Sequence, residues 1–211
     1  MSEISHWDDI YKNSDVESLP WYNKNLDPDL QEALNKLRLN GGNFLDIGTG
    51  PGTQAVELAK IGFNVTGIDI SQTAIEKAKK VSKDVNFIVD DILDTKLPNN
   101  NFDFIFDRGC FHVLPITQLG SYIQTVNGLL KDNGLLFLKC FSTKEKNING
   151  PNRFSPEEMR EIFQASFDIL GVKDTFYQGT LEENPKALFI VLKKPSLRLH
   201  IYMPEKVFYI G

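Results

Sequence analysis

Short apolar runs alternate with amphipathic stretches along most of the chain from Asn43 onward. The predicted strands are the runs Phe44–Ile47, Asn64–Ile68, Val85–Val89, Phe102–Phe106 and Leu135–Cys140. Their hydrophobicity is nearly continuous, without strict polar alternation, which is typical of strands buried on both faces of a parallel sheet. The pattern therefore predicts a parallel sheet that is covered by helices.

Helix signals lie between these strands. Thr53–Lys60 has apolar residues on one face and stops at Gly62, a residue that suits a helix C-terminus. Ser71 is placed to cap the helix that follows it. The stretch Ile116–Leu130 has another apolar stripe at helical spacing, and we expect a turn at Lys131–Gly134.

The last third of the chain has a different pattern. Ser155, Pro156 and Glu158 form a strong helix start, with a capping box and a proline at the first helical position. Two further strands are predicted at Phe167–Tyr177 and Ala187–Lys193. The turn residues between them favour an antiparallel hairpin at the edge of the sheet.

The alternation of strands and helices predicts an α/β, doubly wound, Rossmann-like fold in a single domain. We expect a mostly parallel seven-stranded sheet with an antiparallel edge strand and helices on both faces. Residues 1–42 contain two predicted helices, His6–Tyr11 and Asp29–Leu37, and residues 43–140 form the βα core. Residues 141–211 hold a loop, a helix, the terminal strands and a tail, 197–211, that the sequence does not place.

Composition excludes several classes of protein. The chain is 41% hydrophobic and 24% charged, with a net charge of -5 and a pI near 5.3. An acidic chain lacks the clustered basic residues of a nucleic-acid-binding protein. The two cysteines, Cys110 and Cys140, are far apart, so we expect neither a metal site nor a disulfide framework. With no apolar run of membrane-spanning length and no signal peptide, we expect a cytoplasmic protein without a membrane partner.

The first candidate site is the glycine-rich segment LDIGTGPG, residues 45–52. It follows a strand and precedes a helix, as in doubly wound folds that bind nucleotides. Asp69 ends the second strand, where an acid accepts hydrogen bonds from ribose hydroxyls. Asp46 lies at the start of the glycine loop, and its carboxylate would repel a pyrophosphate. The same carboxylate would attract a ligand that carries an ammonium and a sulfonium. S-adenosylmethionine is such a ligand.

A third acid follows the third strand. Asp91 and Ile92 lie at its carboxyl end, and in a doubly wound sheet such ends border one crevice. Asp91 is suited to accept a hydrogen bond from the exocyclic amine of adenine, and Ile92 to pack on the ring. A plain surface turn is the alternative for this pair.

The segments LDIGTGPG, GIDIS, VDDILDTKLPNNNFD and LLKDNGLLFLK resemble, in order and spacing, the motifs of class I S-adenosylmethionine-dependent methyltransferases. The resemblance implies that residues 43–140 bind the cofactor, that 1–42 form a lid and that 141–211 lie on the acceptor side. The cofactor-binding residues that it implies are Trp7, Tyr11, Asp46, Gly48, Gly50, Asp69, Ile70, Asp91, Ile92 and Asp107.

The segments HWDDIY, LPWY and DRGCFH resemble a small-molecule branch that includes thiopurine, thiol and tellurite-resistance methyltransferases. This resemblance implies a small-molecule acceptor bordered by Trp21 and Tyr22. Arg153 is a candidate to hold an anionic acceptor, although an ordinary solvated arginine is the alternative. His112 is the candidate general base, for those acceptors that must lose a proton. A structural histidine is the alternative.

Three functions follow from these observations. The first is methyl transfer from S-adenosylmethionine to a small molecule by in-line displacement, which releases S-adenosylhomocysteine and uses no metal. The second is binding of that cofactor without turnover. The third is an NAD(P)-dependent oxidoreductase, which the acid at the glycine loop disfavours.

Overall fold

The structure is a computed structural model that describes residues 3–146 and 150–196. Its helices are α1 (Glu3–Asn13), α2 (Pro28–Leu37), α3 (Thr53–Ile61), α4 (Gln72–Val81), α5 (Cys110–Val113), α6 (Leu119–Leu129) and α7 (Pro156–Phe163). Two short 3₁₀ helices span Val16–Ser18 and Ile116–Gln118. The strands are β1 (Asn43–Ile47), β2 (Asn64–Asp69), β3 (Asn86–Val89), β4 (Phe102–Arg108), β5 (Leu130–Ser142), β6 (Arg153–Phe154), β7 (Asp168–Phe176) and β8 (Lys186–Lys193). The tail 197–211, which the sequence does not place, lies outside the described residues.

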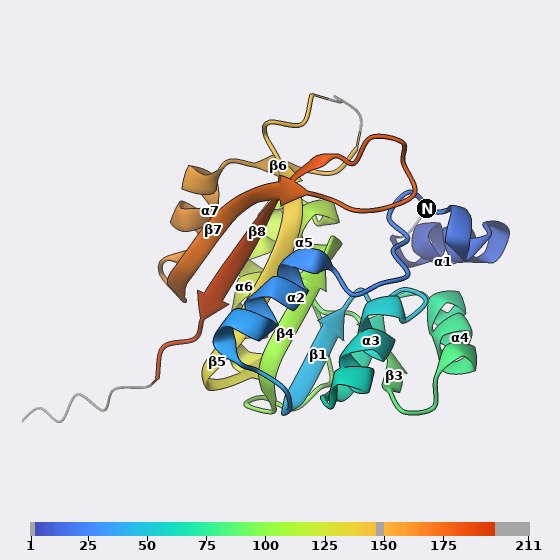
Figure 1. Ribbon diagram of the computed structural model, residues 1–211, viewed down its shortest axis with the longest axis horizontal. Coiled ribbons are helices and arrows are strands. Elements are labelled where there is room, and N and C mark those ends of the chain that lie inside the picture. The colour runs from blue at the N-terminus through green and yellow to red at the C-terminus, as the bar shows by residue number, and fades with distance from the viewer. Residues whose placement is uncertain (1–2, 147–149, 197–211) are drawn as a thin grey trace, which may run out of the picture.

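The predicted sheet is confirmed. Seven strands run in the order β3-β2-β1-β4-β5-β8-β7, and the short β6 pairs with β5 (Figure 1). The strands from β1 to β5 pair in parallel, whereas β8 is antiparallel to both β5 and β7. The predicted hairpin therefore forms the edge of the sheet, with the antiparallel strand one position in from that edge.

Two hydrophobic cores lie on the two faces of the sheet. Phe44 and Leu45, consecutive residues of β1, belong to different cores, because neighbouring side chains of a strand point to opposite faces. One core joins the sheet to α2, α3 and α4, and the other joins it to α5, α6 and α7. The expectation of helices on both faces is confirmed.

The predicted helix ends are confirmed by their caps. Gly62 ends α3 with a φ of 114°, a backbone conformation that favours glycine. The Ser71 hydroxyl accepts a hydrogen bond from the Ala74 N–H at the start of α4. Ser155 and Glu158 form a reciprocal capping box at the start of α7.

The segment after α6 differs from the prediction. The turn expected at Lys131–Gly134 lies inside β5, which begins directly at Leu130 and pairs with β4. The register shifts between the pairs Phe102–Leu130 and Phe104–Leu135, and Asn133 has a φ of 65°. The chain thus turns locally without leaving the sheet, because the pairing with β4 continues on both sides of the shift.

Candidate functional site

One large cavity lies at the carboxyl ends of the parallel strands, with a volume of about 1550 Å³. In a doubly wound sheet this is the edge at which ligands bind. The β1–β3 side of the cavity is lined by Gly48, Asp69, Ile70, Asp91 and Ile92. The β4–β5 side is lined by Cys110, His112, Phe141, Arg153 and Tyr177, and the N-terminal segment adds Trp7, Tyr11 and Trp21.

The glycine loop turns sharply between β1 and α3. Gly48 and Gly50 have φ values of 63° and 54°, which side chains rarely permit. A β-carbon on Gly50 would also lie 2.7 Å from the Tyr11 hydroxyl oxygen. The loop thus brings backbone, without side chains, to the cavity and to α1.

Asp46 lies beneath this loop. Its carboxylate accepts a hydrogen bond from the Thr49 hydroxyl at 2.6 Å, and the residue is only 2% exposed. Burial, together with the neighbouring carboxylates of Asp107 and Asp69, raises the pKa of Asp46 to about 7. Asp46 borders a small recess beside Trp21 rather than the large cavity. The side chain is therefore placed to influence a ligand by its charge from behind the loop.

Asp69 faces the cavity directly from the end of β2. Its two oxygens accept backbone hydrogen bonds, one from the Gly50 N–H and one from the Ser71 N–H, each at 2.9 Å. Burial raises the pKa of Asp69 to about 6 despite these bonds. The carboxylate is held rigidly between the glycine loop and the start of α4, as a ligand-binding acid requires.

Asp91 and Ile92 line the same side of the cavity, after β3. The Asp91 carboxylate accepts a hydrogen bond from the Leu93 N–H at 2.9 Å, which fixes the turn. Ile92 is buried and packs in the core beneath that turn. The structure therefore brings the predicted residues Asp69, Asp91 and Ile92 together, at the ends of β2 and β3.

Asp107, which is expected to contact the cofactor, accepts hydrogen bonds from the protein itself. One oxygen accepts from the Gly109 and Cys110 N–H groups, and the other from the Phe111 N–H and the Tyr122 hydroxyl. The side chain is fully buried and is not part of the cavity lining. Asp107 therefore anchors the segment after β4 through its backbone and hydroxyl donors, and its contact with the cofactor stays a prediction.

His112 lies in the cavity wall, but the structure disfavours its predicted role as a general base. Burial lowers its pKa to about 3. Its Nδ1 accepts a hydrogen bond from the Phe141 N–H at 3.1 Å, so the neutral ring carries its proton on Nε2. The Nε2 edge of the ring is therefore able to donate a hydrogen bond, and the ring does not take up a proton near neutral pH.

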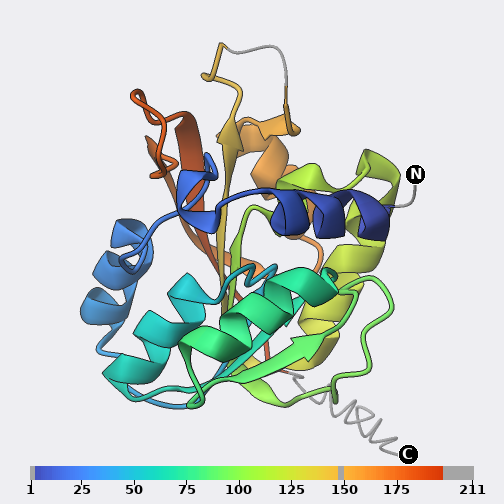
Figure 2. The ribbon, with the colours of Figure 1, turned by 90° about the vertical axis from the view of Figure 1, so that its right-hand side faces the viewer.

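The N-terminal helix α1 covers the carboxyl ends of the strands (Figure 2). The Asp8 carboxylate accepts from the Ser71 hydroxyl and the Thr73 N–H, both at 2.8 Å. The Lys77 ammonium donates to the Tyr11 carbonyl oxygen at 2.5 Å. These contacts fasten α1 to α4 and hold Trp7 and Tyr11 over the cavity, as expected of a lid.

The predicted acceptor residues lie in different places. Trp21 borders the large cavity and packs edge-on against Trp7, with ring centroids 5.8 Å apart. Tyr22 borders only the small recess behind the glycine loop, so the structure separates it from the acceptor side. Arg153, on β6, lines the cavity.

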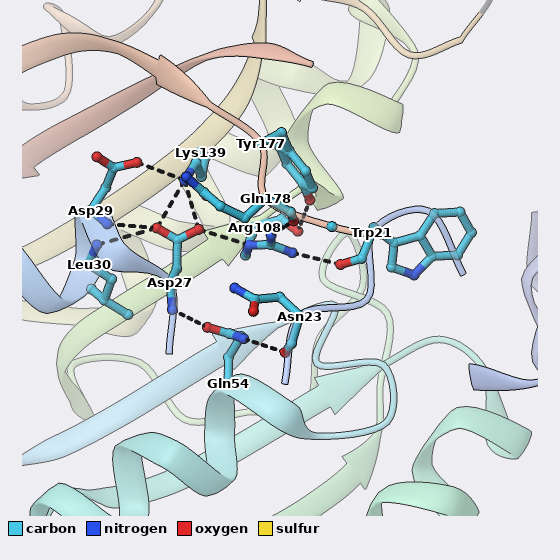
Figure 3. A network of polar contacts seen from close by, with 12 residues as sticks. Trp21, Asn23, Asp27, Asp29, Leu30, Gln54, Arg108, Lys139, Tyr177 and Gln178 are labelled. Carbon is cyan, nitrogen blue, oxygen red and sulfur yellow. Dashed lines mark hydrogen bonds and ion pairs between the residues drawn. The ribbon is translucent and has the colours of Figure 1, made fainter. Parts of the chain in front are cut away.

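A buried ionic network beside the cavity was missed by sequence reasoning (Figure 3). The Lys139 ammonium donates to both Asp27 oxygens, at 3.0 and 2.8 Å, and to Asp29 at 2.7 Å. The Arg108 Nε donates to Asp27 at 3.0 Å. Asp27 also caps α2 by accepting from the Asp29 N–H. The network joins the start of α2 to β4 and β5.

Two further findings concern the described residues alone. No cluster of three or more His, Cys, Asp or Glu side chains within residues 3–146 and 150–196 is arranged to hold a metal ion. In the same ranges, no helix has the length and apolar character needed to cross a membrane.

Comparison with known proteins gives a consistent pattern. The family model described as "Methyltransferase domain" matches residues 44–134. The chain is 32% identical to EEF1A lysine methyltransferase 2 of Danio rerio over 61% of this chain and 60% of that protein. It is 30% identical to the Homo sapiens protein of that name over 68% of this chain and 70% of that one. The chain is also 26% identical to a probable thiol methyltransferase 2 of Arabidopsis thaliana, over 77% of this chain and 75% of that protein.

The fold has many counterparts among solved structures. One, described as "Conversion of a Disulfide Bond into a Thioacetal Group during Echinomycin Biosynthesis", superposes with a TM-score of 0.79. It covers 92% of this chain and 94% of its own, at 22% sequence identity. At that identity the likeness concerns the fold alone.

Proposed function

The chain belongs to the class I S-adenosylmethionine-dependent methyltransferases, and we propose that it methylates a small molecule through a thiolate or a related chalcogen anion. The observation that carries this choice is the chemistry of the wall on the β4–β5 side. Burial lowers the pKa of His112 to about 3 and raises that of Tyr177 above its usual range. Neither group takes up a proton near neutral pH, which favours an acceptor that arrives ionised. A thiol, with an ordinary pKa near 8.5, reaches its nucleophilic form without a base more easily than a lysine amine, with an ordinary pKa near 10.4.

The size of the cavity supports a reaction between two bound molecules. Its volume of about 1550 Å³ exceeds the ~300–1,000 Å³ of a typical single-ligand site. The acids lie on the β1–β3 side, and the β4–β5 side is walled by aromatic rings, including Phe141 and Tyr177 at 5.2 Å between centroids. We assign the first side to the cofactor and the second to the acceptor.

The roles of the cofactor-side residues follow from their positions. Asp69 would accept from the ribose hydroxyls, and Asp91 and Ile92 would frame the adenine. Gly48 and Gly50 would let the backbone approach the methionine portion, with the Asp46 charge behind them. Buried carboxylates with raised pKa values fit a cationic ligand, because a nearby cation offsets the cost of ionising them.

S-adenosylmethionine, when bound, supplies a methyl group already activated by its sulfonium. That methyl group would be available for direct transfer to the acceptor sulfur, with S-adenosylhomocysteine as the leaving group. The protein therefore needs to align the partners and exclude water, and the proposed reaction requires no metal. Trp7, Tyr11 and Trp21 would provide the cover, since they border the cavity from the N-terminal segment.

His112 acts in this proposal as a hydrogen-bond donor. Its ring packs in one wall with Phe141 and Tyr177, whose ring centroids lie 4.6 and 5.7 Å from its own. A donor there stabilises an anionic acceptor without removing a proton from it. Arg153, in the same cavity wall, would add positive charge on that side.

A protein lysine is the second candidate acceptor. It is favoured by the 30–32% identity to EEF1A lysine methyltransferase 2, which is higher than the 26% identity to the thiol methyltransferase. A lysine amine must lose a proton before it attacks, and neither His112 nor Tyr177 is suited to accept one. The chemistry of the wall therefore places this candidate second.

Transfer of labelled methyl groups tests the proposal. The wild-type protein is incubated with labelled S-adenosylmethionine and, separately, thiols, selenols, tellurite, phenols, amines and EEF1A protein. Methylation of thiols or chalcogen anions is the expected result. Methylation of EEF1A alone would overturn the acceptor class in favour of the second candidate, and transfer to no acceptor would favour cofactor binding without turnover.

The pH dependence of the same assay separates the mechanisms. With two thiols of different pKa, the rate at saturating cofactor should rise with pH up to the pKa of each thiol. A profile that is identical for both thiols would instead indicate a titrating group of the enzyme.

A further inference from the structure

Two segments far apart in the sequence meet at the acceptor side of the cavity. They are Leu19–Trp21, before α2, and Gln178–Thr180, after β7. The Thr180 N–H donates to the Pro20 carbonyl oxygen at 3.2 Å, and its hydroxyl donates to the Leu19 carbonyl oxygen at 3.0 Å. The approach is so close that a β-carbon on Gly179 would overlap the Pro20 carbonyl oxygen. Gly179 is therefore required for this contact.

Arg108 holds both segments from the end of β4 (Figure 3). One terminal nitrogen of its guanidinium donates to the Trp21 carbonyl oxygen at 2.9 Å, and the other donates to the Gln178 carbonyl oxygen. The guanidinium also lies over the Tyr177 ring, 4.4 Å from its centroid. The planar guanidinium holds its donors in a rigid fork, so its two terminal nitrogens and Nε reach three separate acceptors in a fixed geometry that a lysine ammonium does not reproduce.

The position of Arg108 is fixed by the network behind it. Its Nε is paired with Asp27, whose carboxylate is fully buried and also paired with Lys139. Lys139 donates in addition to Asp29 and to the Gln178 side-chain oxygen, each at 2.7 Å. Two cations and two carboxylates thus balance in the interior, and a charge removed from such a set leaves its partner uncompensated.

The joined segments face the acceptor. Pro20, Trp21, Tyr177 and Gln178 all line the cavity, on the side that the proposed function assigns to the small molecule. We propose that Arg108 and Gly179 are positioning residues that hold the two segments together as one wall, and that this wall determines the size of acceptor that the enzyme accepts. The contact between Leu19–Trp21 and Gln178–Thr180 is called the junction below. The inference rests on the proposed function for the identity of the substrate, whereas the junction itself is independent of that function.

Gly179→Ala tests the junction with a single added carbon. Its methyl group forces the two segments apart and widens the acceptor side. We expect the ratio of kcat/KM for 2-naphthalenethiol to kcat/KM for 2-mercaptoethanol to rise at least tenfold, chiefly through the KM values. The Kd of S-adenosylhomocysteine should stay within twofold. Gly171→Ala, on β7, is the matched control, since nothing lies within 4 Å of a β-carbon built there.

Arg108→Lys tests the role of the planar guanidinium group. It keeps the charge beside Asp27 but loses the simultaneous bonds to Trp21 and Gln178. The ratio of kcat/KM for 2-naphthalenethiol to kcat/KM for 2-mercaptoethanol should rise, as in Gly179→Ala. A uniform fall in kcat for both thiols, with no change in the ratio, would instead indicate a general structural role and overturn the proposal for specificity.

Amide hydrogen exchange gives a readout that needs no acceptor. In Gly179→Ala, exchange should accelerate at least tenfold in peptides covering 19–25 and 177–185 together, and remain unchanged in β4. Unchanged exchange in both peptides would overturn the junction itself. If the wild type methylates neither thiol, the proposed function fails and the inference about acceptor size fails with it, while the exchange result still decides whether the junction exists.

Discussion

At the scale of single residues, three buried aspartates at the ends of strands have distinct environments. Burial raises the pKa of Asp46 to about 7 and the pKa values of Asp69 and Asp107 to about 6. Asp107 is occupied by the backbone and hydroxyl donors of its own loop. Asp46 and Asp69 adjoin the glycine loop, where a cationic ligand would favour their ionised forms.

This environment predicts a pH dependence at Asp46. Its folded pKa of about 7 lies above the ordinary value of 3.8, so the folded protein keeps a proton that the unfolded chain releases between these values. The contribution of Asp46 to stability is therefore greatest below pH 4 and is lost as pH rises towards 7. A bound cation favours the carboxylate, so the affinity for S-adenosylmethionine should rise over the same window.

Calorimetry at pH 5.5 and pH 8.0 checks this prediction. S-adenosylhomocysteine lacks the sulfonium charge, so the ratio of the two affinities should shift several-fold towards S-adenosylmethionine at the higher pH. Asp46→Asn should reduce the dependence, and the part that remains is expected from Asp69, whose pKa is raised to about 6. A ratio that is constant with pH in the wild type would refute the electrostatic role of Asp46.

Asp69→Asn is the second prediction at this scale. The carboxylate is held by the Gly50 and Ser71 N–H groups and faces the cavity. Loss of charge-assisted hydrogen bonds costs about 1.5–3 kcal/mol, so the Kd of S-adenosylhomocysteine should rise roughly 10- to 100-fold. Asp84→Asn, at an exposed turn, is the control. Equal affinity in both variants would exclude Asp69 from the cofactor site.

The sequence predicts individual residues only where a local pattern marks them. The glycine loop and the acids after β2 and β3 are marked by their place at strand ends, and they do line the cavity or its loop. The Arg108–Asp27 and Lys139–Asp27 pairs are separated by 81 and 112 positions, so no local pattern joins them. The tautomer of His112 likewise depends on a backbone group 29 positions away.

At the scale of elements, α1 is attached both by a hydrophobic cluster that includes Tyr11 and Ala74 and by polar contacts. The Asp8 carboxylate joins it to the start of α4, and the helix keeps Trp7 and Tyr11 over the cavity. Sequence periodicity predicted a helix here, but its docking depends on a side chain that accepts from residues more than 60 positions away. The contacts of Asp8 therefore predict that α1 contributes to ligand affinity.

Asp8→Ala tests that contribution. The loss of its two hydrogen bonds should release α1 and cost about 1 kcal/mol of binding, which is roughly a fivefold higher Kd for S-adenosylhomocysteine. Asp9→Ala is the matched control, because Asp9 is exposed on the same helix. A Kd equal to that of the control would show that α1 does not act as a lid.

The buried network predicts a stability difference between two lysines. Lys139→Met removes the buried cation shared by Asp27 and Asp29, which leaves Asp27 with Arg108 and Asp29 with the half-exposed Lys173, and should reduce the free energy of unfolding by about 3–5 kcal/mol. Lys131→Met removes a partly exposed pair with Asp103 and should cost less than about 1 kcal/mol. Urea denaturation of both variants measures the difference. Equal losses would contradict the importance of the network.

The helices and strands were predicted well where a capping residue or the periodicity of apolar residues marks them. The helix starts at Ser71 and Ser155 and the helix end at Gly62 have such signals, and the structure has all three. The turn expected at Lys131–Gly134 was absorbed into β5 because pairing with β4 is a tertiary interaction. Tertiary pairing thus overrides the local turn signal.

At the scale of the whole molecule, the strand order brings the site together. Parallel pairing of β2, β1 and β4 places their carboxyl ends at one edge, so residues from separate motifs border one cavity. The N-terminal segment and the loop after β7 then complete it from outside the core. A ligand that fills this cavity would contact the N-terminal segment, the core and the loop after β7, and should stabilise the fold as a unit.

Thermal unfolding tests this whole-molecule coupling. A ligand that binds only the folded state at 100 times its Kd stabilises it by about 2.7 kcal/mol. For a chain of this length that corresponds to a rise in Tm of roughly 5–10 °C. S-adenosylhomocysteine should produce this shift in the wild type and a smaller one in Asp69→Asn at the same concentration. NAD⁺ and NADP⁺ should produce none, because their pyrophosphate would meet the acid behind the glycine loop. A shift with NAD⁺ or NADP⁺ comparable to that with S-adenosylhomocysteine would contradict the assignment of the acids to a cationic ligand.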